Sequence, residues 1–459
     1  MTSGEGRRGI AVRTPRYGRT PLTSSTATPR SVLLRSSWAN VNIGDVAHSP
    51  GLITALLDAE PDARITLWPM RLGEREEAMI RRAIPTVTIV RGALDEAGVP
   101  TTPELAAAWD SADVFVHGSA ASASLVPELA AWRERSDRPY GYGGVTEDPL
   151  CPPAWGSLER LRVMTQDLPA TFLEDDARAI IDGAEFLFAR DSISLEYLRS
   201  QGARPGVLEF GPDGTFAYRY RDDAAADAFL AALGLTAGEF GCFVPRLRYT
   251  PYPDIYGTER TREFDRRYAI NAGTVGLDLD TLAAAIATWV RSTGQRAVVV
   301  PEMSYEVELA QDELLPRVPD DVVDQVTVLD RYWPLEEANA VYARARAVVS
   351  MECHSPILAS VHGTPTLYVR QPTDTVKGEM YADLGGTDVV VEIEPDGPEG
   401  AAAAVKALLE DEAASRATSS AMNAAAVGRL RDVARTILFG EGASEFTRGG
   451  READLVPTR

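Results

Sequence analysis

Several short segments place polar side chains directly after a hydrophobic run, a position from which parallel strands commonly present ligand-binding groups. Residues 38–45 form the first such segment and include Asn42, Gly44 and Asp45. Gly44 allows a tight backbone, and Asp45 brings a carboxylate to the entry of a helix predicted at 50–59, where a ligand would be held. The same residues also suit plain helix capping, and both interpretations stay open. The segment has neither the glycine pattern of dinucleotide-binding loops nor the lysine of phosphate-binding loops.

Cations at the ends of predicted strands form a second group of candidates. Arg190 directly follows a short apolar run, and Arg246 and Arg248 follow another. Because a guanidinium group pairs bidentately with carboxylate or phosphate, these side chains predict an anion site. Arg370 ends a further run, and Lys377 is one of only two lysines among 46 basic residues. Solvated surface loops remain the alternative interpretation of these basic segments.

His354 is the best candidate for moving a proton. It stands between a predicted strand and a predicted helix, and an imidazole acts as a general acid or base near neutral pH. A packed or capping histidine is the alternative. The neighbouring Cys353 would offer a thiol nucleophile, but adjacent side chains diverge along a strand, which weakens a Cys–His pair. Glu352 adds a carboxylate to the same segment.

Composition limits the classes of partner. The 459 residues carry a formal net charge of −21, which argues against binding of nucleic acid and against docking on an anionic membrane surface. Three separated cysteines and four histidines predict neither a disulfide framework nor a structural zinc site, and we expect no metal or cofactor. No apolar run approaches the ~20 residues that span a bilayer. We therefore expect a cytoplasmic protein without a transmembrane segment.

Short β-branched runs alternate with Ala- and Leu-rich helical stretches along most of the chain, which predicts an α/β fold with parallel sheets covered on both faces. A polar stretch at 219–241 separates two such sets. We predict a flexible tail at 1–29, Rossmann-like doubly wound domains at 30–225 and 240–400, and C-terminal helices with a polar tail at 401–459. The ligand site is expected in the cleft that the domains face, beyond the carboxyl ends of the strands.

The candidate segments also form an ordered set along the chain. Its members are Asn42-x-Gly44-Asp45, Ala189-Arg190-Asp191, Phe210-Gly211-Pro212-Asp213, His354-Ser355 and Gly363-Thr364-Pro365. In this order and at these distances they resemble the polysaccharide pyruvyltransferase family over about residues 31–400. The resemblance implies two Rossmann-like halves similar to the GT-B glycosyltransferase architecture. It also implies transfer of the pyruvyl group of phosphoenolpyruvate, a small anionic donor, onto hydroxyls of a sugar or glycan, which gives a pyruvate ketal.

The resemblance assigns roles residue by residue. Asp45 corresponds to the aspartate of the family's first loop, and we expect it to act as a base or to orient the acceptor. Arg190 corresponds to the arginine of the family's Arg-Asp pair, and Arg370 to an arginine that follows the family's histidine. His354 corresponds to that histidine and is our expected general acid. The basic residues of the second group would together hold the donor.

One position departs from the family. An arginine that contacts phosphoenolpyruvate usually stands two residues before the histidine, where this chain has Glu352. A carboxylate at this position would repel a trianionic donor unless another of the cations named above replaces the missing arginine. We assign Glu352, like Asn42 and Gly44, to loop structure or acceptor binding.

Two other functions remain compatible with the sequence. A GT-B-type glycosyltransferase would use a nucleotide sugar as its donor, and a non-catalytic relative would bind a glycan without turning it over. Protection by a UDP- or GDP-sugar rather than by phosphoenolpyruvate distinguishes the first of these. The acceptor sugar, its linkage and the oligomeric state do not follow from the sequence.

Overall fold

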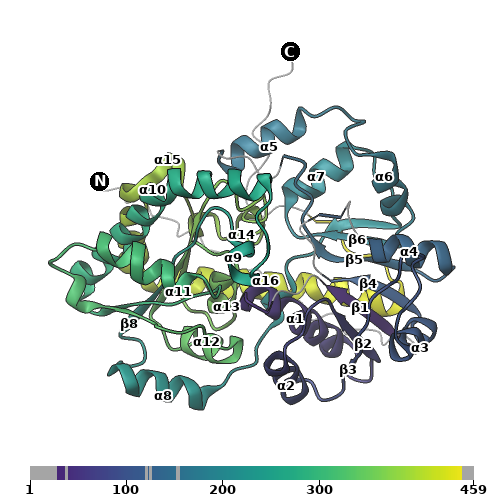
Figure 1. Ribbon diagram of the computed structural model, residues 1–459, viewed down its shortest axis with the longest axis horizontal. Helices are drawn as coiled ribbons and strands as arrows, with labels where there is room; N and C mark the ends of the chain where they lie inside the picture. The colour runs from purple at the N-terminus through teal and green to yellow at the C-terminus, as the bar shows by residue number, and fades with distance from the viewer. Residues whose placement is uncertain (1–27, 37–39, 119–121, 124–126, 151–155, 447–459) are drawn as a thin grey trace, which may run out of the picture.

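Two parallel β-sheets flanked by helices form two Rossmann-like domains in the computed structural model (Figure 1). The structure describes residues 28–36, 40–118, 122–123, 127–150 and 156–446. Parts of three predictions lie outside these residues: most of the tail at 1–29, positions 38 and 39 of the first candidate segment, and the end of the C-terminal tail.

The first sheet has seven strands within the described residues, in the order β3-β2-β1-β4-β5-β6-β7, and all of its pairs are parallel. Because the strand order reverses between β1 and β4, a topological switch point lies at the carboxyl ends of these two strands. The strands are β1 (Val32–Ser36), β2 (Ile65–Pro69), β3 (Thr88–Ile89), β4 (Val114–His117), β5 (Tyr140–Val145), β6 (Phe186–Ala189) and β7 (Val207–Phe210).

The second sheet, counted over residues 156–446, has six parallel strands in the order β10-β9-β8-β11-β12-β13. Its switch point lies between β8 and β11, which are buried along their whole length, as expected for strands covered on both faces. The strands are β8 (Phe240–Val244), β9 (Arg296–Val299), β10 (Val326–Val328), β11 (Ala347–Ser350), β12 (Thr366–Arg370) and β13 (Val390–Glu392).

Helices connect the strands in both domains. Those from the first domain to the linker are α1 (Ile43–Ala59), α2 (Glu74–Ala83), α3 (Pro103–Ser111), α4 (Pro127–Arg135), α5 (Leu158–Gln166), α6 (Asp175–Asp182), α7 (Ser192–Ser200), the 3-10 turn η1 (Gly214–Ala217) and α8 (Asp223–Leu233). Those of the second domain and the C-terminus are α9 (Tyr252–Tyr256), α10 (Arg262–Thr293), α11 (Glu306–Leu309), α12 (Leu335–Tyr342), α13 (His354–Val361), α14 (Glu379–Asp383), α15 (Ile393–Glu410) and α16 (Glu412–Phe439). Short turns of other helical types are η2 (Ala310–Leu314), η3 (Leu315–Arg317), η4 (Val323–Gln325) and η5 (Thr387–Val389).

Helix α1 begins earlier than the sequence indicates. We predicted a helix that starts at Pro50, but α1 starts at Ile43 and contains this proline. Proline removes one helical hydrogen bond, yet the residues on both sides of it are buried, and their packing outweighs the lost bond. Gly44 and Asp45 therefore lie in the first turn of a helix. Asn42 caps that turn, because its side chain accepts the N–H groups of Gly44 and Asp45 at 2.7 and 3.1 Å.

The C-terminal helices reach both domains. α15 packs against α10 of the second domain, whereas α16 returns to the first domain and lies against α1 (Figure 1). Val433 and Ile437 of α16 share a buried core with Leu52 and Phe188 of the first domain. Removal of these apolar side chains from water favours the association of α16 with the first domain. Helix α16 therefore completes the core of the first domain.

Candidate active site

The candidate site lies where the two switch points meet. β1 leads into α1, β8 leads into the loop that carries Arg246, and β11 leads into α13, which begins at His354. The backbones of the two domains join here through hydrogen bonds of 3.0 Å. The Ile43 N–H donates to the Glu302 carbonyl, and the Ser304 N–H donates to the Val41 carbonyl. The carboxyl ends of both sheets therefore face one another across this contact.

His354 is packed between the domains. Its ring lies over the first turn of α1, where a Cβ on Gly44 would stand 2.2 Å from Nδ1 and 2.3 Å from Cγ. Only glycine at position 44 allows this contact. On another side, the ring meets His48 edge to face, with 4.8 Å between the ring centroids. The glycine of the first candidate segment thus makes room for the histidine of the other domain.

Glu302 orients His354. Its Oε1 accepts a hydrogen bond from Nδ1 at 3.0 Å, and its Oε2 accepts the N–H and the hydroxyl of Ser355, both at 2.7 Å. A carboxylate at Nδ1 favours the tautomer that carries its proton there and leaves Nε2 available for proton transfer. Burial raises the pKa of Glu302 to about 7. Burial, together with the nearby His48, lowers the pKa of His354 to about 3, so the free ring is neutral at neutral pH.

Asp213 is the carboxylate of the first domain around which His48, Arg190 and His354 gather. Its Oδ1 lies 2.6 Å from Nδ1 of His48, and its Oδ2 lies 2.9 Å from Arg190 and 3.9 Å from Nε2 of His354. Burial alone would raise the pKa of Asp213, but His48, Arg190 and His354 hold it well below its usual range. The predicted anion ligand Arg190 therefore stands in the site, next to the predicted acid.

The same side chains include a potential metal-binding trio. One ring nitrogen of His48, one oxygen of Asp213 and one ring nitrogen of His354 all lie within 4.8 Å of one another. Two ligands of a tetrahedral zinc ion stand ~3.3 Å apart. The 2.6 Å between His48 and Asp213 is instead a hydrogen-bond distance, and the other Asp213 oxygen is held by Arg190. This spacing suits proton transfer better than metal binding.

A second charged cluster combines Arg246 and Lys377 with two carboxylates. Nε of Arg246 lies 2.9 Å from Glu352, and its Nη1 lies 2.7 Å from Asp374. Nζ of Lys377 lies 2.7 Å from the same Asp374 oxygen. Burial raises the pKa of Glu352 to about 7, against the lowering effect of Arg246. The carboxylate that departs from the family pattern is thus paired with a cation.

Asp45 lies within electrostatic reach of both clusters. It is half-buried, burial raises its pKa, and His48, His354 and Lys377 act against that rise. A raised pKa suits a group that takes a proton from a hydroxyl. The two residues predicted to be catalytic, Asp45 and His354, therefore share one site, and their roles in the reaction stay a prediction.

Two of the predicted donor-binding arginines are held in ion pairs of the second domain. Arg248 makes two bonds to Asp278, at 2.9 and 3.0 Å. Arg370 is fully buried, pairs with Glu392 at 2.8 Å and donates to the Thr375 carbonyl at 2.7 Å. These contacts use the guanidinium groups to support neighbouring segments. They do not favour direct contact with a donor, which stays a prediction for both residues.

The sequence did not point to Glu302, His48 or Asp374. Glu302 follows the apolar run of β9, which is the position of the other candidates, and this signal would have identified it. His48 lies in the part of α1 that the predicted helix left out, and Asp374 lies in the loop from which only Lys377 was selected. The alternative thiol nucleophile is not favoured, because Cys353 is fully buried and burial raises the pKa of its thiol.

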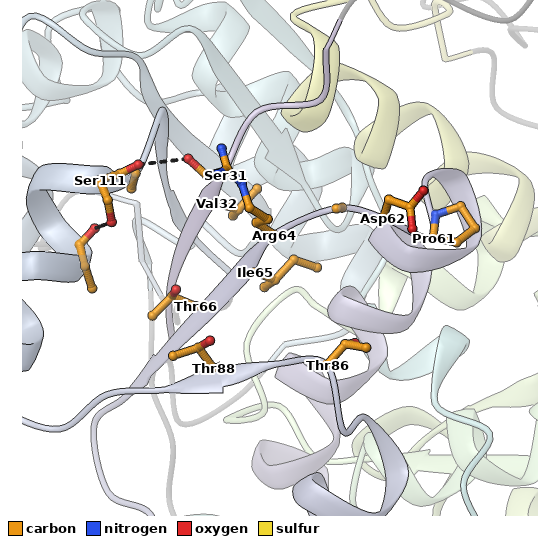
Figure 2. A pocket seen from close by; sticks show the side chains of 13 residues that line it. Ser31, Val32, Pro61, Asp62, Arg64, Ile65, Thr66, Thr86, Thr88 and Ser111 are labelled. Carbon is orange, nitrogen blue, oxygen red and sulfur yellow. Dashed lines mark hydrogen bonds between the residues drawn. The ribbon is translucent and has the colours of Figure 1, made fainter.

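A pocket of 430 Å³ lies at the amino ends of strands of the first sheet, on the side opposite the candidate site (Figure 2). Its lining includes Ser31, Arg64 and Thr88, which stand at the amino ends of β1, β2 and β3. The Ser31 hydroxyl donates to the Ser111 carbonyl at 2.9 Å on one side of it (Figure 2). Open α/β sheets bind their ligands at the carboxyl ends of the strands, so we do not connect this pocket with the reaction.

Two Rossmann-like domains whose strands direct their carboxyl ends at one site define an α/β protein of GT-B-like architecture, as predicted from the sequence. Solved structures with this fold are similar over most of the chain. S. aureus MnaA in a co-structure with UDP is 12% identical, with a TM-score of 0.53 over 91% of this chain and 100% of that one. Anabaena HepE in complex with UDP-glucose is 13% identical, with a TM-score of 0.51 over 88% of this chain and 98% of that one. At these identities the similarity shows the fold alone.

The chain belongs to the polysaccharide pyruvyl transferase family. The family model matches residues 42–371, a range that contains Asp45, Arg190, Asp213 and His354. The protein is therefore a transferase, and the resemblance noted in the sequence is confirmed. No curated protein matches its sequence. Over the part of the chain that the structure describes, no helix combines the length and the apolar character that crossing a membrane requires.

Proposed function

We propose that this enzyme transfers the pyruvyl group of phosphoenolpyruvate to two hydroxyls of a sugar or glycan and closes a cyclic pyruvate ketal. Membership of the family supports the reaction class. The observation that carries the proposal is the buried pair of His354 and Glu302, which bond at 3.0 Å beside the carboxylate of Asp45. This arrangement provides an acid, a group that stabilises its charged form, and a base.

His354 is the proposed acid for C3 of the donor. In the free enzyme its ring is neutral, because burial and His48 lower its pKa to about 3. A trianionic donor beside the ring favours the imidazolium form, so donor binding brings a proton to Nε2. Glu302 at Nδ1 stabilises that cation. Transfer of the Nε2 proton to C3 turns C2 into an electrophile of oxocarbenium character.

Asp45 is the proposed base for the acceptor. It takes the proton of the first hydroxyl as the hydroxyl oxygen attacks C2, and the C–O bond to phosphate then breaks. Attack by a second hydroxyl closes the ketal. The two hydroxyls release two protons in total. One of them makes up for the proton that His354 delivers to C3, and the other leaves with phosphate. Arg190 and the cluster of Arg246 and Lys377 offset the negative charge of the donor.

Purified enzyme mixed with phosphoenolpyruvate and a panel of sugar acceptors tests the proposal. We expect acceptor-dependent release of inorganic phosphate and a ketal methyl signal by NMR. We also expect His354→Ala to lower the rate by ~10²–10⁴-fold, the usual contribution of a general acid. Phosphate release that is unchanged in His354→Ala contradicts the catalytic assignment. Thermal stabilisation by UDP- or GDP-sugars, but not by phosphoenolpyruvate, would favour a glycosyltransferase instead.

A further inference from the structure

We propose that Arg246 and Lys377 together bind one oxyanion of the donor, its carboxylate or its phosphate. Glu352 and Asp374 are then positioning residues that hold the two cations side by side. This inference rests on the proposed function and specifies where the charge of the donor is held.

The two cations share one carboxylate oxygen. Nη1 of Arg246 and Nζ of Lys377 each lie 2.7 Å from Oδ1 of Asp374, which brings the two positive groups next to each other. The Tyr368 hydroxyl donates to the other Asp374 oxygen. Glu352 holds Arg246 from a second direction, through Nε at 2.9 Å. Both ends of the arginine fork are therefore oriented by buried carboxylates.

The two cations of this cluster are more exposed to solvent than its two carboxylates. The side chains of Arg246 and Lys377 are 11% and 12% exposed, whereas those of Glu352 and Asp374 are 3% and 2% exposed. An anion that enters the site therefore meets the positive groups before the negative ones. Buried ion pairs contribute little net stability by themselves, so stability alone is a weak explanation for four charged groups in this place.

The backbone of the loop that presents Asp374 and Lys377 is strained. Thr375 lies between them with φ of 55°, and among the described residues it is the only non-glycine with a positive φ. A β-branched residue keeps this conformation only where its surroundings impose it, and such strain concentrates at functional sites. Arg370 imposes it here, because its guanidinium donates to the Thr375 carbonyl at 2.7 Å. Arg370 thus supports the loop that carries Asp374 and Lys377.

Glu352 need not repel the donor. Burial favours its neutral form, as do the charges of Glu302 and Asp374, while Arg246 and Lys377 act in the opposite direction. A protonated Glu352 keeps a carbonyl oxygen, which is a hydrogen-bond acceptor, beside Nε of Arg246. Two cations then face the single negative charge of Asp374, and an oxyanion of the donor completes the charge balance of the cluster.

Calorimetric titration of the intact enzyme with phosphoenolpyruvate tests the inference. We expect Lys377→Met to weaken binding by about tenfold or more, the order expected for a lost charged hydrogen bond. Lys406→Met is the matched control, because Lys406 is the other lysine and lies exposed on α15. Glu352→Ala should weaken binding although it removes an acid, since Arg246 loses its support. Glu352→Gln keeps the acceptor oxygen and should bind at least as tightly as the wild type.

Several outcomes overturn the inference. Equal affinity of Lys377→Met and wild type rejects the shared anion site, and tighter binding by both Glu352 variants rejects the positioning role. Melting temperatures show which variants fold. Because Lys377 is partly exposed, the titration of Lys377→Met tests the shared anion site even if Glu352→Ala is unstable. Separate titrations with inorganic phosphate and pyruvate show which end of the donor is bound. If Lys377→Met changes the affinity for neither of these anions, the proposed site is contradicted. If the wild type binds phosphate or pyruvate more tightly than Lys377→Met does, but does not bind phosphoenolpyruvate, the anion site is supported and the proposed donor is rejected.

Discussion

The imidazole of His354 lies directly against the backbone of Gly44, so that a Cβ on Gly44 would stand 2.2 Å from Nδ1. His354 begins α13 of the second domain, and Gly44 lies in α1 of the first domain. One glycine therefore sets the distance between the domains at the site. Any larger side chain there must displace the ring, its bond to Glu302 or the contact between the domains.

Gly44→Ala is expected to damage both stability and activity. Overpacking of this contact costs ~1–3 kcal/mol of unfolding free energy, and phosphate release should fall by at least about tenfold as Nδ1 leaves Glu302. Thermal unfolding and a phosphate-release assay measure the two effects. Gly428→Ala on the exposed face of α16 is the control, because a Cβ there meets nothing within 4 Å. Normal turnover in Gly44→Ala would show that the contact is dispensable.

Glu302→Gln should lower kcat by ~10²–10⁴-fold with little change in KM, because an amide presents no charge to the imidazolium of His354. Steady-state kinetics with phosphoenolpyruvate and acceptor separate the two parameters. The matched control is Glu337→Gln, a buried glutamate of α12 that pairs with Arg331. An equal loss in both variants, or a loss confined to KM, contradicts the role of Glu302.

Donor affinity should decrease as the pH rises through about 7. Burial raises the pKa of Glu352 to about 7, so this group is neutral below that pH and adds a negative charge above it. Calorimetry between about pH 5.5 and 8.5 should show a smaller decrease for Glu352→Gln than for the wild type. Titration of the donor phosphate itself is common to both proteins and cancels in the difference. Identical profiles would exclude Glu352 as the titrating group.

The charged or titratable groups that face Glu352 are Arg246, Lys377, Asp374, Glu302, Glu306, Tyr252 and Tyr305.

Treatment with a chelator should leave the rate of transfer unchanged. Nδ1 of His48 and Oδ1 of Asp213 are only 2.6 Å apart, which is too close for two ligands of one tetrahedral ion, and the other Asp213 oxygen is paired with Arg190. Metal analysis of the purified enzyme and assays with and without EDTA provide the measurement. Activity that EDTA abolishes and added zinc restores would assign a metal to this trio.

Many elements of the fold follow from the sequence, because strands buried on both faces are continuous apolar runs. The apolar runs at 114–116 and 347–350 predict β4 and β11 to within a residue. β5 has no such signal, since three of its six residues are glycines. Packing explains one of them: a Cβ on Gly141 would stand 2.4 Å from the Phe186 ring. Such a requirement comes from the neighbouring strand and leaves no local pattern.

The sequence by itself determines which residues reach the carboxyl ends of the strands, and this placed Asp45, Arg190 and His354 together. It does not determine their partners. Glu302 and Gly44 come from separate segments, and their distances to His354 depend on how the two domains pack. Glu352 shows the difference most clearly, because the sequence predicts a repulsive carboxylate and the fold supplies Arg246 at 2.9 Å. The effect of a buried charge depends on the groups within a few ångströms of it, and only the tertiary structure decides which groups those are.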